Sequence, residues 1–261
     1  MNKLIIVEGL PCSGKSTTAK YIADKLSAKY FDEGSGIHPA DYEFHAFIND
    51  RLFNNFNIEE QAWIEQNAVK NANGYVVSLS AFSGELFDKL LQYKIYDFLP
   101  WETEYPLMLD KWSEFVQGVA SDERYVFNCV FLQNPMCETM MRFGFDTEQS
   151  FAYISRISHI IKPLNPVVIY LHSDNIRQAI EKALPERGED WLNGVIDYHC
   201  NGAYGKVNQL CGFDGYISAL EERQRRELEI LQRLHMPYAI IREPQENWGC
   251  AYLQINKALE R

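Results

Sequence analysis

The segment GLPCSGKS at residues 9–16, directly after the apolar run LIIV at residues 4–7, constrains this chain more than any other feature. It fits the pattern G-x-x-x-x-G-K-[ST], in which a strand leads through a glycine-rich loop into a helix. Gly9 and Gly14 allow backbone N–H groups to turn toward an anion, and the dipole of the following helix adds to the attraction. A glycine-rich turn without a ligand does not need the Lys15–Ser16 pair. The motif therefore predicts a phosphate-binding loop, called the phosphate loop below.

The residue types in this loop have definite expected roles. Lys15 should neutralise the β- and γ-phosphates of a nucleotide, and Ser16 should place its hydroxyl on Mg²⁺. We therefore expect ATP and Mg²⁺ as cofactors, with Ser16 as a metal ligand. Cys12 lies close to Lys15 and to a helix N-terminus, which predicts a lowered thiol pKa and a reactive thiol. The expected nucleotide-binding residues are Gly9, Leu10, Pro11, Cys12, Ser13, Gly14, Lys15, Ser16 and Thr17.

Apolar runs rich in β-branched residues alternate with helical patterns along the chain, which is typical of βαβ units around a parallel sheet. This alternation predicts an α/β fold of three layers, α/β/α, with a mainly parallel five-stranded sheet and a helical lid. Residues 75–80 (YVVSLS) fit either a strand or a link to a long helix that begins near Ser83. The five expected core strands are Lys3–Glu8, Tyr30–Glu33, Arg124–Asn128, Pro166–His172 and Pro237–Arg242.

Helix starts are marked by capping residues. The helix after the phosphate loop should run from Lys15 to about Lys29, and another should run from Asp146 to Ile161, where Pro163 ends it. A capping residue followed three positions later by Glu or Gln is typical of a helix N-terminus. Three pairs fit this pattern: Asn57 with Glu60, Asp146 with Gln149, and Ser218 with Glu221.

Composition limits the range of partners. The length of 261 residues favours a single domain over residues 1–261, and the formal net charge of −11 argues against a surface that follows nucleic-acid phosphates. No apolar run is long enough to span a bilayer, and the chain starts with a strand and not a signal peptide, which predicts a cytoplasmic protein without membrane partners. The six cysteines form no C-x-x-C pair, so neither a zinc site nor a disulfide framework is indicated.

The segment from residue 173 to residue 215 interrupts the regular alternation. It contains six glycines among helical fragments, together with the cations Arg177, Lys182, Arg187 and Lys206. Its position after the fourth expected strand and its repeated glycines predict a mobile lid that closes over a bound nucleotide. The alternative is an inserted helical segment that only makes oligomer contacts. A homodimer is one such oligomer that the sequence allows.

Residues 6–18 (IVEGLPCSGKSTT) resemble the opening of thymidylate kinases and deoxynucleoside kinases, in which a Glu, here Glu8, directly precedes the first loop glycine. Beyond this stretch the chain resembles these families only in the order of its elements. These are a second strand ending in a carboxylate, a lid after the fourth strand and a short loop after the fifth. The resemblance implies a P-loop kinase with a three-layer α/β fold. It also implies that adenine lies against the last loop, residues 243–247 (EPQEN).

The chain departs from these families at the end of the third strand. Thymidylate kinases show Asp-Arg there and deoxynucleoside kinases show Glu-Arg, whereas this chain has Asn128-Cys129. An acid for the Mg²⁺ shell and an arginine for the acceptor are therefore missing at that point. Asn128 fits either a hydrogen-bond donor in the site or a simple strand terminator. The lid also lacks a dense R-x-R-x-E run, so the resemblance names no acceptor.

Five residues are the candidates for catalysis. Beside Lys15, Glu33 is expected to be the base that takes the proton of an acceptor hydroxyl, because ligands of open α/β sheets gather at the carboxyl ends of the strands. The alternative is that Asp32-Glu33-Gly34 is a plain strand-to-turn signal. Three arginines are expected to contact the transferring phosphate, although each also fits an ordinary surface position: Arg156, Arg177 and Arg187.

The expected acceptor is a small molecule of unknown identity, bound by aromatic walls with a few polar groups. The segments that fit this description are residues 38–42 (HPADY), Phe82, Tyr105 and residues 131–133 (FLQ). Two functions remain open. One is ATP-dependent phosphoryl transfer to a small-molecule hydroxyl or phosphate acceptor, and the other is a nucleotide-binding regulatory or degenerate module without transfer. GTPase switching is disfavoured because the N-K-x-D guanine signature is absent.

Overall fold

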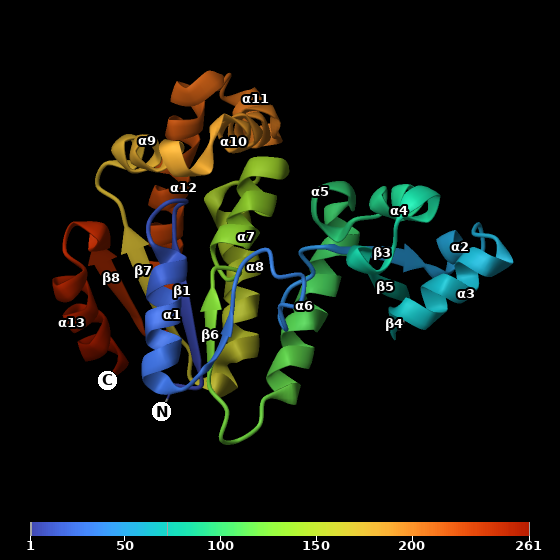
Figure 1. Cartoon of the computed structure of the whole chain (residues 1–261), viewed down its shortest axis with the longest axis horizontal. Helices are drawn as coiled ribbons and strands as arrows, with labels where there is room; N and C mark the ends of the chain where they lie inside the picture. Colours follow the sequence, from blue (N-terminus) through green and yellow to red (C-terminus); the bar gives the residue numbers. More distant parts are fainter. Residues whose placement is uncertain (1, 72, 261) are drawn as a thin grey trace. The chain divides into compact units, whose positions relative to one another are not determined.

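The computed structural model describes residues 2–71 and 73–260 of the chain. These residues form two compact units (Figure 1). The larger unit consists of Met1–Asp32 and Phe115–Arg261, and the smaller one consists of Glu33–Glu114. A compact unit is not by itself an independent domain, so the single domain over residues 1–261 stays a prediction.

A five-stranded parallel sheet forms the centre of the larger unit. The strand order is β2-β6-β1-β7-β8, and β1 lies in the middle, paired with β6 on one side and β7 on the other. The strands are β1 (Leu4–Gly9), β2 (Lys29–Phe31), β6 (Tyr125–Asn128), β7 (Val167–His172) and β8 (Tyr238–Arg242). All five expected strands are present. Because β2 ends at Phe31, Glu33 lies in the turn beyond the strand, and the expectation that it ends the strand is wrong.

Helices cover both faces of this sheet. Alternate side chains of a strand point to opposite faces, and Ile5 and Val7 pack with Ile22 and Ile255 in one cluster. This face carries α1 (Lys15–Leu26) and α13 (Trp248–Leu259). On the other face, the hydroxyl of Tyr170 donates to Glu227 of α12 (Gly212–Arg233), which contacts α8 (Thr147–Ile161). The three-layer α/β/α class is confirmed, and α1 ends at Leu26, three residues before the expected Lys29.

The helices between β7 and α12 occupy the expected lid segment. Figure 1 shows α9 to α11 above the carboxyl ends of β1 and β7. Since α12 begins at Gly212, Ser218 lies inside a helix, and the start predicted there is wrong. The capping box of Asp146 and Gln149 is confirmed. The remaining helical segments of this unit are α7 (Gln133–Met136), η2 (Cys137–Arg142), η3 (Lys162–Leu164), α9 (Ile176–Arg187), α10 (Glu189–Asn201), α11 (Ala203–Val207) and η4 (Pro244–Glu246).

The smaller unit contains a second sheet, which the sequence did not predict. Its antiparallel strands β3 (His45–Asn49), β4 (Ala68–Asn71) and β5 (Gly74–Ser78) have the order β3-β5-β4. The open assignment of residues 75–80 is thereby resolved, because most of them form β5 and the rest begin η1. The capping box of Asn57 and Glu60 is confirmed. The helices are α2 (Asp50–Phe53), α3 (Ile58–Asn67), η1 (Leu79–Ala81), α4 (Gly84–Leu91), α5 (Ile95–Phe98) and the first part of α6 (Trp101–Gly118).

Within residues 2–71 and 73–260, no helix combines the length and the apolar character needed to cross a membrane.

Gly74 is the position where the second sheet depends on a glycine. Its φ is +158°, and a Cβ there would lie 2.2 Å from the carbonyl oxygen of Ile48 in the paired strand. We expect Gly74→Ala to destabilise the smaller unit by roughly 1–3 kcal/mol, because the backbone must move or remain strained. Hydrogen exchange of the β3 and β5 amides, together with urea unfolding, measures this effect.

Gly194 in α10 supplies the matched control. A Cβ there meets open space, and its backbone is helical. Gly194→Ala should therefore gain about 0.5–1 kcal/mol from the higher helix propensity of alanine. Unchanged exchange of the β3 and β5 amides in Gly74→Ala would contradict the argument.

Candidate phosphate-binding site

The phosphate loop joins β1 to α1, and its two glycines are required by geometry. Gly9 has a φ of +144° and Gly14 a φ of +92°. A Cβ on Gly9 would lie 2.5 Å from the carbonyl oxygen of Leu171, and one on Gly14 would lie 2.6 Å from Cη2 of Trp248. Only glycine fits at both positions, and such positive φ values let successive N–H groups face a common centre.

Lys15 folds back over the loop that precedes it. Its Nζ donates to the carbonyl oxygens of Gly9 at 3.0 Å and Leu10 at 2.9 Å, and the residue is 7% exposed. An ammonium group carries three donors. These two bonds therefore hold the positive charge within the loop, beside the N-terminus of α1, where anions are favoured.

Three polar side chains meet where the phosphate loop passes into α1. Nδ2 of Asn128 donates to Oγ of Ser16 at 3.0 Å and also to the carboxylate of Asp32. Asn128 is the last residue of β6, and Asp32 follows β2 directly. The phenol of Tyr30 lies beside them, and its pKa is raised, mainly by burial and then by Asp32. Parallel strands β2 and β6 thus bring an acid to the serine of the loop.

This group of residues fits Mg²⁺. Two oxygens, the Ser16 hydroxyl and the Asp32 carboxylate, meet at Nδ2 of Asn128, while Oδ1 of the same amide is buried and has no hydrogen-bond partner. Mg²⁺ takes oxygen ligands and is usually held by one or two carboxylates together with substrate phosphates. Within the described ranges, no three His, Cys, Asp or Glu side chains form a metal-binding group. A dedicated all-protein metal cage is thus not found there.

Asp32 is the site residue that sequence reasoning missed. The expected acid at the third strand is absent, and Cys129 in the place of the arginine is buried with a φ of +59°. Asp32 instead offers a carboxylate from the neighbouring strand. The signal was present, because Asp32 is also a carboxylate at the carboxyl end of a strand, where ligands of open α/β sheets gather. The sequence favours Glu33 because it predicts that the strand ends at that residue.

Cys12 does not have the lowered pKa that the sequence predicted. Burial raises the pKa of its thiol, and this effect exceeds the lowering by Arg187 and Lys15. A thiol with a raised pKa has less thiolate and is less reactive. The same interaction shows that Arg187, at the end of α9, lies beside the phosphate loop.

The structure separates the other expected catalytic residues. Arg177 pairs with Asp214 at 2.5 Å and stacks over Phe213, so its charge is directed toward the start of α12. Arg156 is an exposed side chain on α8. Glu33 is exposed and belongs to the smaller unit. Of the three arginines, Arg187 is the one that these contacts place at the loop, and the catalytic roles of Glu33, Arg156, Arg177 and Arg187 stay predictions.

The loop after β8 contacts the phosphate loop, and adenine binding at this loop stays a prediction. Nε2 of Gln245 donates to the carbonyl oxygen of Cys12. Trp248 lies against Gly14 and stacks with Tyr252, with ring centroids 5.6 Å apart. Residues 243–247 and the first turn of α13 therefore form an aromatic and polar border beside the loop.

Glu8 ties the phosphate loop to the segment that follows β6. Its fully buried carboxylate accepts the backbone N–H groups of Phe131 at 2.9 Å, Leu132 at 2.8 Å and Gln133 at 3.2 Å. Burial raises the pKa of Glu8 from 4.5 to about 7, and the nearby Glu227 adds to this, while the three N–H groups oppose it. The carboxylate holds this segment next to the start of the loop.

The expected acceptor-binding residues fall in both units. Phe131–Gln133 belong to the larger unit, and the other segments belong to the smaller one. In the smaller unit Tyr96 donates to Asp41, whose carboxyl pKa burial raises to about 7. Nζ of Lys111 lies 4.7 Å from the ring of Tyr42. This buried polar cluster is consistent with a binding role, and the acceptor pocket stays a prediction.

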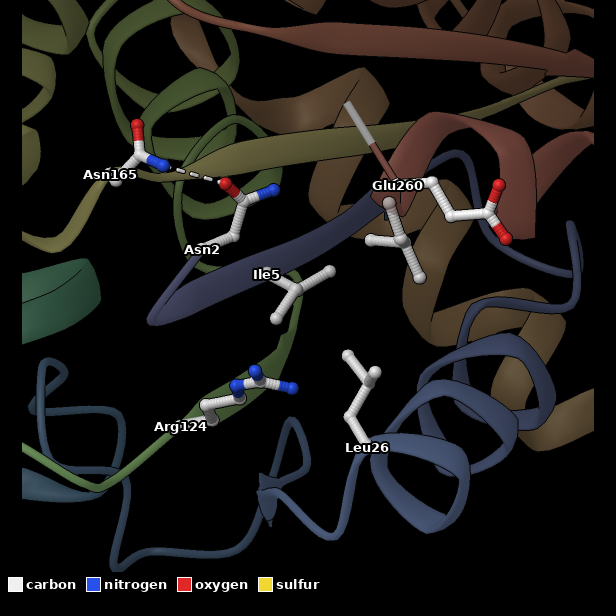
Figure 2. Close-up of a pocket in the computed structure, with 7 residues that line it drawn as sticks. Asn2, Ile5, Leu26, Arg124, Asn165 and Glu260 are labelled. Atoms are coloured by element: carbon white, nitrogen blue, oxygen red, sulfur yellow. Dashed lines mark hydrogen bonds between the residues drawn. The ribbon is translucent and has the colours of Figure 1, made fainter.

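Two pockets lie at the opposite end of the sheet. One of them has a volume of about 180 Å³. Nδ2 of Asn165 donates there to Oδ1 of Asn2 at 2.8 Å (Figure 2). The other, of about 360 Å³, lies between the ends of α8 and α12. Both border the amino ends of the strands, whereas open α/β sheets bind ligands at the carboxyl ends. We therefore assign neither pocket to the nucleotide.

No protein-family model matches the chain, and neither does any curated protein. Among solved structures, the deoxyadenosine kinase from M. mycoides with bound dATP is 17% identical, with a TM-score of 0.45 and with 97% of this chain and 98% of that chain covered. The thymidylate kinase from Ehrlichia chaffeensis is 10% identical, with a TM-score of 0.43 and coverages of 98% and 97%. The thymidylate kinase from Candida albicans is 13% identical, with a TM-score of 0.40 and coverages of 98% and 93%.

The raised pKa of Glu8 makes the stability of the fold depend on pH. The folded protein holds a proton on Glu8 up to about pH 7, whereas the unfolded chain releases it near 4.5. Stability therefore falls as pH rises through this window. Glu8→Gln cannot titrate, so the free energy of unfolding of the wild type should decline relative to that of Glu8→Gln between pH 5 and pH 8. Urea unfolding across this range measures the difference.

Glu222→Gln is the control for this measurement. Arg225 and Arg226 hold the pKa of Glu222 down to about 2, so its stabilising effect is complete above pH 4.5 and is lost only in more acidic solution. Its difference from the wild type should therefore stay flat between pH 5 and pH 8. A flat difference for Glu8→Gln as well would show that Glu8 is ionised in the folded protein throughout.

Proposed function

We propose that this protein transfers a phosphoryl group from ATP, with Mg²⁺, to a small-molecule acceptor. The observation that carries the proposal is the meeting of Ser16, Asn128 and Asp32 at the end of a loop whose lysine is already drawn into its centre. Phosphoryl transfer requires positioning and charge neutralisation more than covalent chemistry. A lysine, a helix N-terminus and a group of oxygen ligands supply these in one place.

We assign separate roles to the residues of the loop and of its surroundings. The N–H groups from Gly9 to Thr17 would hold the phosphates, and Lys15 would exchange its two carbonyl bonds for phosphate oxygens. Ser16, Asp32 and Asn128 would hold Mg²⁺, which neutralises charge on the phosphates when it is bound. The Trp248 and Gln245 border would receive the adenine.

The acceptor side depends on residues whose roles are still proposals. Glu33 would take the proton from the acceptor hydroxyl, one residue after the metal-binding Asp32. Arg187 would bring positive charge to the transferring phosphate from its place beside Cys12. Residues 173–215 would close over the nucleotide and exclude water. Arg177 would have to leave Asp214 to take part in this closure.

The alternative of a degenerate module without transfer was suggested by the missing acid at residue 128. Asp32 weakens that argument, because it offers a carboxylate to the same place through its bond with Asn128. We therefore favour transfer. The proposed partners are a nucleotide and a small-molecule acceptor, with no nucleic acid and no membrane.

Replacing Lys15 tests nucleotide binding. Lys15→Ala should lower ATP affinity about 10- to 100-fold, because a charge-assisted bond to phosphate contributes about 1.5–3 kcal/mol. Calorimetric titration with ATP and Mg²⁺ measures the affinity, and turnover is sought with a panel of nucleosides, nucleotides and hydroxylated metabolites. Lys20→Ala, which changes an exposed lysine of the same helix, is the control and should bind ATP as the wild type does. Equal affinity in all three proteins would refute the proposal.

A neighbouring pair of acids separates the metal role from the base role. Asp32→Asn should raise the Mg²⁺ concentration for half-maximal activity about tenfold, because one charged ligand is lost. Glu33→Gln should lower turnover by about 10²–10⁴-fold and leave ATP affinity within about twofold, as expected for a general base. Steady-state kinetics at several Mg²⁺ concentrations distinguish the two. An exchange of these effects would show that Asp32 is the base.

A further inference from the structure

Strand β4 forms one edge of the second sheet, and its outer side is open. The strand order is β3-β5-β4, so in residues 2–71 and 73–260 β4 pairs with β5 alone (Figure 1). The opposite edge of the sheet is covered. The N–H of Phe47 in β3 donates to the carbonyl oxygen of Tyr93 at 2.9 Å, and Ala46 forms a bridge with Lys94. The second sheet can therefore be extended at β4 only.

The hydrogen bond of Phe47 also shows which backbone groups of β4 face outward. In an antiparallel pair, the N–H and C=O groups of one residue point to the same side, and successive residues alternate. The N–H of Phe47 points away from β5, so its register partner Val76 directs its backbone groups to Val69 of β4. Ala68 and Lys70 flank Val69 in the strand. They therefore direct their N–H and C=O groups toward the open side.

One face of the second sheet carries an apolar row that runs up to this edge. Register partners share a face, so the side chains of Phe47, Val76 and Val69 lie in a line across the three strands. Phe47 and Val76 are 5% and 3% exposed, whereas Val69 is 66% exposed. The row is therefore buried except at its last member, which lies on the edge strand.

Strand β4 also lacks the features by which proteins usually protect an exposed edge. Such edges often carry a proline, a bulge or a lysine that obstructs a second strand. The residues of β4 (Ala68–Asn71) include no proline, and their register with β5 continues without a bulge. The Nζ of Lys70 turns back over β5, since it lies 4.9 Å from the ring centroid of Tyr75 and donates to the Tyr75 hydroxyl at 3.3 Å. The edge is thus able to pair.

We propose that β4 pairs antiparallel with β4 of a second copy of this chain, so that the two small sheets join into one continuous sheet. A closed dimer of identical chains uses the same surface on both copies. Val69 would lie opposite the partner's Val69. The backbone groups of Ala68 would bond to those of the partner's Lys70, and those of Lys70 would bond to the partner's Ala68. This pairing uses the smaller unit alone and does not depend on the proposed function.

The properties of β4 favour a second copy over an unrelated strand. In the proposed register each Val69 covers the other, so the apolar row of one copy continues into that of its partner. Lys70 lies opposite the partner's Ala68, and no like charges face each other. The next register with outward-facing groups aligned would place Lys70 opposite the partner's Lys70, which is destabilising. Because the β3 edge is covered, pairing stops at two copies and cannot continue into a fibre.

Sedimentation velocity of the full chain tests this pairing. The wild type should pass from monomer to dimer between about 1 μM and about 1 mM, because so short a strand makes a small interface that associates weakly. Val69→Lys and Val69→Glu, each alone, should raise the dimer dissociation constant about tenfold or more, because like charges then lie directly opposite. An equimolar mixture of the two variants should dimerise again, because opposite charges then face each other. Both variants should keep the wild-type melting temperature, since the Val69 side chain is exposed.

Val207→Lys is the matched control. Val207 in α11 is 79% exposed, so the same change is made at a surface valine of the larger unit. This variant should dimerise as the wild type does. Amide hydrogen exchange supplies a second readout in the wild type. Raising the protein concentration should slow the exchange of the Ala68 and Lys70 amides and leave that of the Val69 amide unchanged, because the Val69 amide already faces β5.

Three results would overturn the inference. A wild type that stays monomeric throughout would show that no second copy covers β4 and would leave the edge to a strand of another protein. A dimer that persists in Val69→Lys would form through another surface. A mixture of Val69→Lys and Val69→Glu that stays monomeric would exclude the register in which Val69 lies opposite the partner's Val69.

Discussion

The buried carboxylate of Glu8 is the interaction on which the arrangement around the phosphate loop depends. Glu8 is the next-to-last residue of the fully buried strand β1, and its carboxylate accepts three consecutive backbone N–H groups from the segment after β6. Those N–H groups would otherwise be buried without partners, at a cost of about 1–3 kcal/mol each. Because the segment is held at its backbone, Phe131 and Leu132 can fill the interior while Asn128, just before them, keeps its place opposite Ser16. The Glu8 side chain thus keeps the carboxyl end of β6 close to the carboxyl end of β1.

The face of the sheet that carries Glu8 is unusually polar for a core. Tyr170 is the register partner of Glu8 and donates to Glu227, which in turn pairs with Arg223. The opposite face, under α1 and α13, is apolar throughout its cluster of Ile5, Val7 and Ile169. Alternation along β1 therefore separates the two faces, since Ile5 and Val7 pack against helices and Glu8 places an ionisable group on the other face. Burial of these groups is tolerated because Arg223 pairs with Glu227 and Glu8 accepts three N–H groups.

Much of the larger unit could be read from the chain because its signals are local. The loop pattern, the β-branched runs and the Asp146–Gln149 box each act within a few residues. The second sheet could not be predicted from the sequence, because β4 and β5 are short. Their pairing depends on Gly74, and the need for glycine there is visible only once the backbone of Ile48 lies next to it. Ser218 and Glu221 have the spacing of a capping pair but lie inside α12, where apolar packing outweighs the preference of serine for a helix N-terminus. Asp32 was missed since its role comes from Asn128, far away in sequence.

The position of Lys15 has a consequence for how the loop responds to its surroundings. Because its ammonium is bound to the carbonyl oxygens of Gly9 and Leu10, the loop carries its own internal cross-link. Such a loop is preorganised, and association with an anion becomes an exchange of bonding partners with little loss of chain entropy. Because the ammonium is almost fully buried, dissolved salts should screen it only weakly, and an anion must enter the loop itself to displace the two carbonyl oxygens.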